Sequence, residues 1–150
     1  MTTLVLDSNL LVLLIAGMAS RSYVGKHRRL RDYDQSDFDT LFEIVEAASQ
    51  IIVTPHVLTE TSNLLGLIGE PIRAHLVRTF RTFIKIATEK FTESNTAVDQ
   101  AEFSRLWLTD SALLVELERG HVLLTADLDL YLAAIRRGYQ AVNFNHIRPQ

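Results

Sequence analysis

The sequence predicts an α/β domain built around a parallel sheet. Short apolar segments recur along the chain between longer segments with helical spacing. The short segments are apolar at nearly every position, which indicates strands that are buried on both faces. Strands that alternate with helices in this way form parallel sheets with helices on both sides. No repeat, low-complexity segment or linker divides the sequence, so a single domain over residues 1–150 is expected.

The expected elements follow from this alternation. We expect strands at residues 3–6, 51–53, 121–125 and 141–144. We expect helices at residues 10–17, 37–48, 55–68, 71–87, 100–119 and 128–137. Residues 18–37 are rich in Arg and Asp and predict a basic, polar insertion or loop. Residues 88–99 are mostly polar and predict a connection.

Residues with strong positional preferences set several helix ends. Ser36 and Thr54 are expected N-caps, because their hydroxyl groups can accept hydrogen bonds from the first helical turn. Pro55 suits the first helical position, where no hydrogen bond from its nitrogen is needed. Glycines are expected to end three helices, at Gly69, Gly120 and Gly138.

The composition excludes several classes of protein. No cysteine is present, which removes disulfides, thiolate metal sites and cysteine nucleophiles. The 18 acidic residues outnumber the 15 Lys and Arg, and the net charge of −3 argues against nucleic-acid binding through bulk positive charge. The most apolar stretch, residues 10–18, is far shorter than the roughly 20 residues of a membrane span, and no basic segment precedes it as in a secretory signal. We therefore expect a cytoplasmic protein with no membrane partner.

Four acidic residues carry most of the functional information. Asp7 and Asp127 each follow an expected strand, and ligand sites in open parallel sheets form beyond the carboxyl ends of strands. Glu60 falls at the edge of the apolar stripe of helix 55–68, from which a carboxylate could lean over a cleft. Asp110 shares a helical face with large apolar residues. The other positions of that face are Phe103, Leu106, Trp107, Leu113, Leu114 and Leu117.

A structural role is the alternative for each of these acids. Asp7 and Asp127 could cap the helices that follow them, and Asp129 could add favourable charge to a first turn. Asp110 could lie in the first turn of a helix that restarts near Thr109. A carboxylate in the position of Glu60 is often only a solvated surface group.

Taken together, the acids predict a metal site. Carboxylates that converge on one cleft raise one another's pKa unless a cation lies among them. Oxygen-only ligands select hard cations such as Mg²⁺ or Mn²⁺. Such a site suits hydrolysis of a phosphodiester by a metal-activated water. Setting aside Asp7, Glu60, Asp110, Asp127 and Asp129 leaves 13 of the 18 acids against 15 bases, so the acidic total is no argument against an RNA substrate.

Four segments, in order, resemble the motifs of PIN-domain ribonucleases. They are Leu-Val-Leu-Asp7-Ser8-Asn9, Thr54-Pro55-His-Val-Leu-Thr-Glu60, Leu-Thr-Asp110-Ser-Ala-Leu-Leu and Leu-Leu-Thr125-Ala-Asp127-Leu-Asp129-Leu. These motifs extend over nearly the whole chain. The resemblance implies a three-layer α/β/α domain with a central parallel sheet and RNA cleavage that depends on Mg²⁺ or Mn²⁺.

The resemblance also assigns roles to individual residues and to partners. It makes Asp7, Glu60, Asp110 and Asp127 catalytic metal ligands. It makes Asp129 a further metal ligand, and it makes Asn9 and Thr125 supporting residues. Many small members are VapC-like toxins of toxin–antitoxin pairs, often homodimers, so an antitoxin protein and a second copy of the chain are candidate partners. The insertion at residues 18–37 departs from the shortest such toxins.

Two groups of basic residues are candidate contacts for an RNA substrate. They are Arg78, Arg81 and Lys85 on one face of helix 71–87, and Lys26, Arg28, Arg29 and Arg31 in the insertion. Tyr23 and Tyr33 lie close to the second group in sequence, and arginine with aromatic groups suits single-stranded RNA. The alternative is two solvated basic surfaces, or one that docks an acidic partner.

Two other functions compete with RNA hydrolysis. The first is a module of the same fold that has lost catalysis and only holds RNA or a protein. The second is a phosphoacceptor receiver domain, which also places Asp beyond parallel strands. That class requires paired acids near the first strand, whereas Asp7 is preceded by Leu-Val-Leu and followed by Ser8.

Overall fold

The central sheet has five parallel strands within residues 2–149, which are the residues described by the structure, a computed structural model. The strands are β1 (Thr3–Leu6), β2 (Gln50–Val53), β3 (Thr88–Glu89), β4 (Val122–Thr125) and β5 (Ala141–Asn143). Their order is β3-β2-β1-β4-β5, so β1 is central. Leu4 pairs with Ile51 on one side and with Val122 on the other. The parallel α/β prediction is thereby confirmed.

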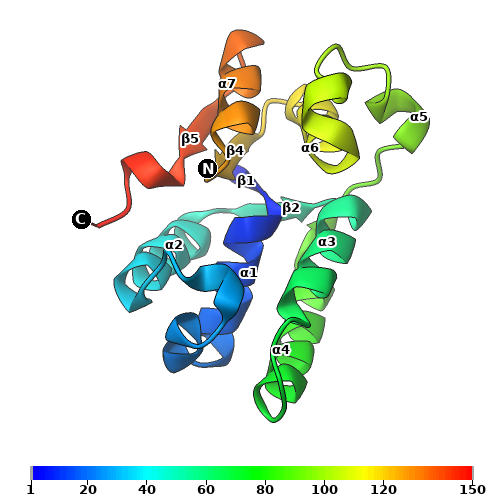
Figure 1. Ribbon diagram of the computed structural model, residues 1–150. Coiled ribbons are helices and arrows are strands. Elements are labelled where there is room, and N and C mark those ends of the chain that lie inside the picture. Colours follow the sequence, from blue (N-terminus) through cyan, green and yellow to red (C-terminus); the bar gives the residue numbers. More distant parts are fainter. Residues whose placement is uncertain (1, 150) are drawn as a thin grey trace.

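Helices cover both faces of this sheet. They are α1 (Ser8–Ala19), α2 (Gln35–Ala47), α3 (Pro55–Leu65), α4 (Ile72–Ile86), α5 (Ser94–Ala97), α6 (Phe103–Leu117) and α7 (Leu128–Arg136). Figure 1 shows α1 to α4 on one face of the sheet and α6 and α7 on the other. The result is the three-layer α/β/α architecture.

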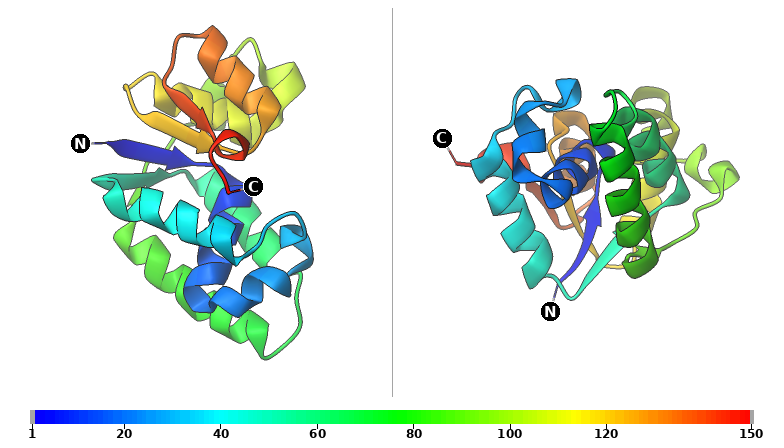
Figure 2. Two further views of the ribbon diagram at one scale, coloured as in Figure 1. Left: turned by 90° about the vertical axis from the view of Figure 1, so that its left-hand side faces the viewer. Right: turned by 90° about the horizontal axis from the view of Figure 1, so that it is seen from below.

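Helix α1 forms the centre of its layer. Its residues 10–17 are all buried, because α2, α3 and α4 pack around it. Figure 2 shows α1 between α2 and α4. This surrounding explains why the segment is apolar at nearly every position and lacks an amphipathic pattern. A helix that is enclosed in this way fixes the position of the chain on both sides of it, including Asp7.

Residues 18–37 are more ordered than the predicted loop. They include two short 3₁₀ helices, η1 (Arg21–Gly25) and η2 (Arg28–Leu30), which bury Val24 and Leu30 against the core. The prediction that Ser36 caps the next helix was wrong. Asp34 caps α2 instead, and it forms a reciprocal pair of hydrogen bonds with Asp37 at the third helical position.

The other differences concern short elements and helix ends. Residues 88–99 contain β3 and α5, both too short to give a sequence pattern. Helix α3 begins as predicted, with Thr54 as N-cap and Pro55 in its first turn, but ends at Leu65 with Gly66 as its C-cap, so Gly69 does not terminate it. Within residues 2–149, every helix is too short or too polar to span a bilayer.

Gly17 allows α1 and α2 to approach closely. A Cβ atom at this position would overlap the ring of Phe38, which is itself buried. We predict that Gly17→Ala lowers the free energy of unfolding by about 1–3 kcal/mol, as overpacked core positions do. Urea denaturation followed by circular dichroism measures the change.

Gly25→Ala is the matched control for this prediction. A Cβ atom at Gly25 meets nothing within 4 Å. The free energy of unfolding of this variant should therefore stay within about 1 kcal/mol of the wild-type value. Equal stabilities of the two variants would contradict the packing that we describe between α1 and α2.

Candidate active site

Asp7 lies at the carboxyl end of β1 and is buried. Its Oδ1 accepts a hydrogen bond of 3.0 Å from the Leu10 N–H, so Asp7 caps α1. Its Oδ2 accepts hydrogen bonds from the Thr125 hydroxyl and, at 3.3 Å, from the Ala126 N–H. The carboxylate therefore joins the end of β1 both to α1 and to the end of β4.

Asp127 lies on the same edge of the sheet. It caps α7, because its Oδ1 accepts a hydrogen bond of 3.0 Å from the Leu130 N–H. Its own N–H donates to the Thr125 Oγ1 at 2.9 Å. The Thr125 hydroxyl thus connects the Asp7 carboxylate to the backbone of Asp127. The capping roles considered as alternatives are real, and they place both acids at one site.

Asp110 follows a break in α6. Trp107 has φ 65° and ψ −167°, a backbone region that non-glycine residues rarely adopt, and the helix resumes after it. Asp110 therefore lies in the first turn of the second part of α6. The continuous helical face is therefore wrong, and the alternative of a restart near Thr109 is correct, although the break lies two residues earlier. Asp110 is nevertheless partly buried.

Electrostatics connects Asp110 to the other acids. Burial raises the pKa of the Asp110 carboxyl to about 7, with further contributions from the charges of Asp127, Asp7 and Glu60. Burial also raises the pKa of Asp7, and this shift is opposed mainly by the hydrogen bond from Thr125. The charges of the other three predicted acids thus all act on Asp110.

Glu60 is the most exposed of the four acids. It lies on α3 and lines a cavity of about 380 Å³ together with Thr109, the neighbour of Asp110. Helices α3 and α6 are in contact, so the α3 residue Glu60 and the α6 residue Thr109 line the same cavity. An exposed glutamate has several flexible torsions, so Glu60 can change its reach at little cost.

The chemistry of the site fits a hard cation. The side chains that surround Asp110 electrostatically are carboxylates, and no basic side chain contributes to its pKa. Three buried hydroxyls, those of Ser8, Thr61 and Ser111, lack hydrogen-bond partners, and each follows one of the acids directly. Across residues 2–149, however, no three His, Asp or Glu side chains are already grouped as ligands of one ion.

The supporting residues take different positions. Thr125 is buried and bonded to Asp7, as the resemblance implies for a supporting residue. Asn9 is exposed near the start of α1 and lines a cavity beside the site. Asp129 is exposed in the first turn of α7, in accord with its alternative role as a favourable charge at a helix N-terminus.

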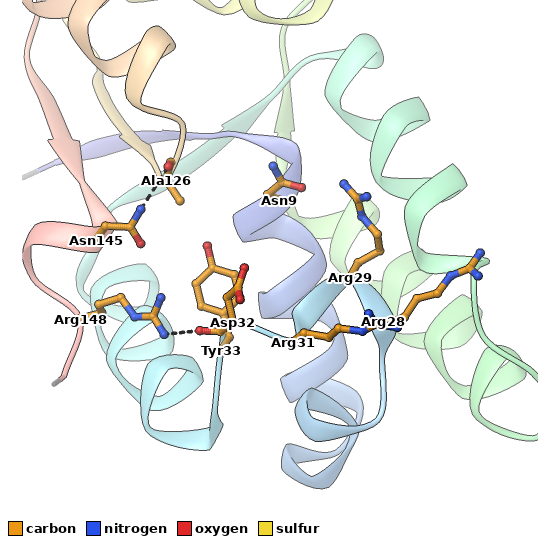
Figure 3. A pocket seen from close by; sticks show the side chains of 9 residues that line it. All are labelled: Asn9, Arg28, Arg29, Arg31, Asp32, Tyr33, Ala126, Asn145 and Arg148. Atoms are coloured by element: carbon orange, nitrogen blue, oxygen red, sulfur yellow. Dashed lines mark hydrogen bonds between the residues drawn. The ribbon is translucent and has the colours of Figure 1, made fainter.

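The two basic groups lie in different places. Arg28, Arg29 and Arg31 line a cavity of about 650 Å³ beside Asp7, together with Asn9 and Ala126 (Figure 3). Lys26 is not among the lining residues, and its Nζ lies 5.9 Å from the centre of the Tyr23 ring.

The basic residues of α4 belong to another surface. Arg81 and Lys85 line a separate cavity of about 380 Å³ with Val77 and Phe80. Arg78 is exposed on the same helix. Lys85 lies three residues before Thr88, where β3 begins, and thus near the amino edge of the sheet, opposite Asp7.

Three residues near the site escaped sequence reasoning. Arg148 and Asn145 line the cavity beside Asp7, but nothing in their local pattern distinguishes them from surface residues. Trp107 was assigned to the apolar face of α6, yet 73% of its surface is exposed because the helix breaks there. The sequence signal that could have indicated the exposure of Trp107 was the alternative of a helix restart near Thr109.

Comparisons with known proteins give information on the fold alone. No family model matches the chain, and no curated protein matches its sequence. A solved structure, described as a domain of a functionally unknown protein from Methanocaldococcus jannaschii DSM 2661, is similar. The TM-score is 0.50 at 16% sequence identity, over 95% of this chain and 91% of that chain. This likeness agrees with the three-layer architecture.

The raised pKa of Asp110 predicts how stability depends on pH without added metal. The folded protein holds this proton up to pH about 7, whereas the unfolded chain releases it near pH 4. The contribution to stability is therefore complete at low pH and is lost as the pH rises through this range. We expect the free energy of unfolding of Asp110→Asn to exceed the wild-type value above pH 7 by about 2–4 kcal/mol.

Urea titrations between pH 4 and 8 in a chelating buffer test this prediction. Asp129→Asn is the matched control, since Asp129 is exposed, and its curve should stay parallel to that of the wild type. Parallel curves for the wild type and Asp110→Asn would show that the Asp110 carboxyl has an ordinary pKa.

Proposed function

We propose that this protein is a divalent-metal-dependent endoribonuclease that hydrolyses RNA phosphodiester bonds. One observation supports the proposal: four acids from separate parts of the chain are close enough that the charges of three of them act on the fourth, Asp110. Asp7 follows β1, Asp127 follows β4, and Glu60 and Asp110 come from α3 and α6. Ligand sites in open α/β sheets form at this edge.

Mg²⁺ or Mn²⁺ is the cofactor of the proposed reaction. Asp7, Glu60, Asp110 and Asp127 would hold it, with movement of the exposed Glu60 side chain to complete the ligand set. When bound, the ion supplies a water of lowered pKa and neutralises charge that develops on the phosphate.

The chain itself contributes preorganisation. Three donors fix the two oxygens of the Asp7 carboxylate, namely the Leu10 N–H, the Thr125 hydroxyl and the Ala126 N–H. Thr125 is a positioning residue, because its hydroxyl orients Asp7 and also accepts a hydrogen bond from the Asp127 N–H. A carboxylate held in this way need not reorganise when it binds its ligand.

The proposed assignment to a particular kind of nuclease is based on the resemblance to PIN-domain ribonucleases. The four acidic motifs occur in the same order as in that family, and the three-layer fold is compatible with it. A VapC-like toxin with an antitoxin partner, a homodimer and a cytoplasmic location belong to the same proposal. A small adjacent gene for a DNA-binding protein would support the toxin function.

A second candidate is a module of this fold that binds RNA or protein without cleavage. It is favoured by one observation, that no ready-made set of three ligands exists among residues 2–149. The raised pKa of Asp110 counts against this binding module, because it reflects a loss of stability from burial and from repulsion among the four acids. Without a cation, nothing offsets that loss.

Cleavage of a circular single-stranded RNA tests the proposed function, since a circle has no ends for an exonuclease. We expect cleavage with Mn²⁺ or Mg²⁺ and none with chelator. Asp7→Asn and Asp110→Asn should each lose at least about 100-fold in rate, because each removes a proposed metal ligand.

Asp99→Asn is the control, because Asp99 is an exposed acid just beyond α5 and should leave the rate unchanged. Cleavage by both site variants at the wild-type rate would exclude the assignment of the site. A wild-type protein that retains RNA but never cleaves it would favour the binding module.

A further inference from the structure

The cavity of about 650 Å³ beside Asp7 is a candidate subsite in its own right. Five of its lining residues belong to the insertion, and the others come from the start of α1, the end of β4 and the C-terminal segment. They are Arg28, Arg29, Arg31, Asp32 and Tyr33, and Asn9, Ala126, Asn145 and Arg148. Ala126 donates its N–H to the Asp7 carboxylate, so the cavity adjoins the candidate active site directly. Its volume falls within the range of ordinary ligand sites.

The lining of this cavity is strongly basic. Arg28, Arg29 and Arg31 are all exposed, and none forms an ion pair within residues 2–149. The charge of Arg148 is compensated, since its Nη2 lies 2.5 Å from an Asp37 oxygen. Asp32 is the acidic residue that lines the cavity. Three uncompensated arginines against one aspartate leave a clear excess of positive charge.

The backbone that carries these arginines is anchored to the core. His27 is buried, and its Nδ1 accepts a hydrogen bond of 3.2 Å from the Arg29 N–H while its Nε2 donates to the Leu65 carbonyl at 3.2 Å. Beyond the cluster, Arg148 stacks 4.7 Å from the centre of the Tyr33 ring and donates to the Asp32 carbonyl. The segment is thus held at both ends while its arginine side chains remain available.

The basic lining of the cavity, rather than a shared direction of its side chains, points to an anionic ligand. In Figure 3 the Arg29 side chain extends toward Asn9 at the start of α1, and Arg31 extends toward Arg28. Guanidinium groups bind phosphate oxygens through two parallel hydrogen bonds, and asparagine amides can add further donors. Such a set of donors suits a phosphate group.

We propose that this cavity binds a phosphate of an RNA strand whose neighbouring phosphodiester lies at the four acids. The inference rests on the proposed nuclease function and deepens it, because it states the side from which the strand reaches the site. The occupant must continue past Ala126 toward Asp7, which suits a strand with regularly spaced phosphates. The phosphate is either a backbone phosphate or the terminal 5′-phosphate.

Fluorescence anisotropy with a short single-stranded RNA tests the subsite, in two forms that carry a 5′-phosphate or a 5′-hydroxyl. Chelator is present throughout, so that binding is measured without cleavage. We expect the triple variant Arg28→Ala, Arg29→Ala, Arg31→Ala to bind at least about tenfold more weakly, and the slope of log affinity against log salt to fall by about 2. Arg136→Ala is the control, since Arg136 is exposed in the last turn of α7, belongs to neither basic group and should leave affinity unchanged.

The two RNA forms distinguish the sources of the phosphate. Loss with both forms assigns a backbone phosphate, and loss with the 5′-phosphorylated form alone assigns the terminal phosphate. Unchanged affinity for both forms would overturn the proposal. A glutamate-rich peptide that displaces the RNA from the wild type as efficiently, per negative charge, as unlabelled RNA does would also overturn the proposal. That result would favour an acidic protein partner.

The assay also separates this proposal from the proposed nuclease activity. The nuclease proposal fails alone if the triple variant loses RNA binding while the wild type cleaves no RNA with any metal. The subsite proposal fails alone if the wild type cleaves RNA and the triple variant binds it normally. Circular dichroism of the triple variant should match the wild type, because the three side chains are exposed.

Discussion

The carboxylate of Asp7 is the contact on which both the fold and the site depend. It caps α1, the helix that the other helices of its layer surround, and it accepts hydrogen bonds from Thr125 and Ala126 at the end of β4. One buried side chain thus joins two neighbouring strands and the central helix. The Thr125 hydroxyl also accepts a hydrogen bond from the Asp127 N–H, so the positions of Asp7 and Asp127 follow from the packing of the fold.

The site has a cost in stability that the rest of the fold does not share. Burial and three neighbouring acids raise the pKa of Asp110, and no basic group offsets this charge. Elsewhere the chain pairs its less exposed acids, as Asp37 with Arg148 and Glu102 with Arg137. Such an unpaired cluster supports the proposed cation site, since a cation would remove the repulsion.

Much of the fold could be predicted from the sequence, because its signals are local. Buried strands and the N-cap pair Thr54-Pro55 need only neighbouring residues to be recognised. The elements that were missed have long-range causes: β3 is defined by its pairing with β2, and η2 is stabilised by His27 bonding to Leu65. Among the predicted site acids, Asp110 was selected as an exception on an apolar helical face, whereas Asp7 and Asp127 were selected because each follows a buried strand. Arg148 was not found, because its partners Tyr33 and Asp37 are far away in sequence.

Calorimetric titration of Mn²⁺ tests most directly the central claim, that the four acids form a cation site. The measurement is made above the Asp110 pKa of about 7, where the cluster is charged. We expect saturable binding to the wild type, weakened at least about tenfold in Asp110→Asn and unchanged in Asp99→Asn. Heats of dilution alone with the wild type, or equal binding by Asp110→Asn, would contradict it.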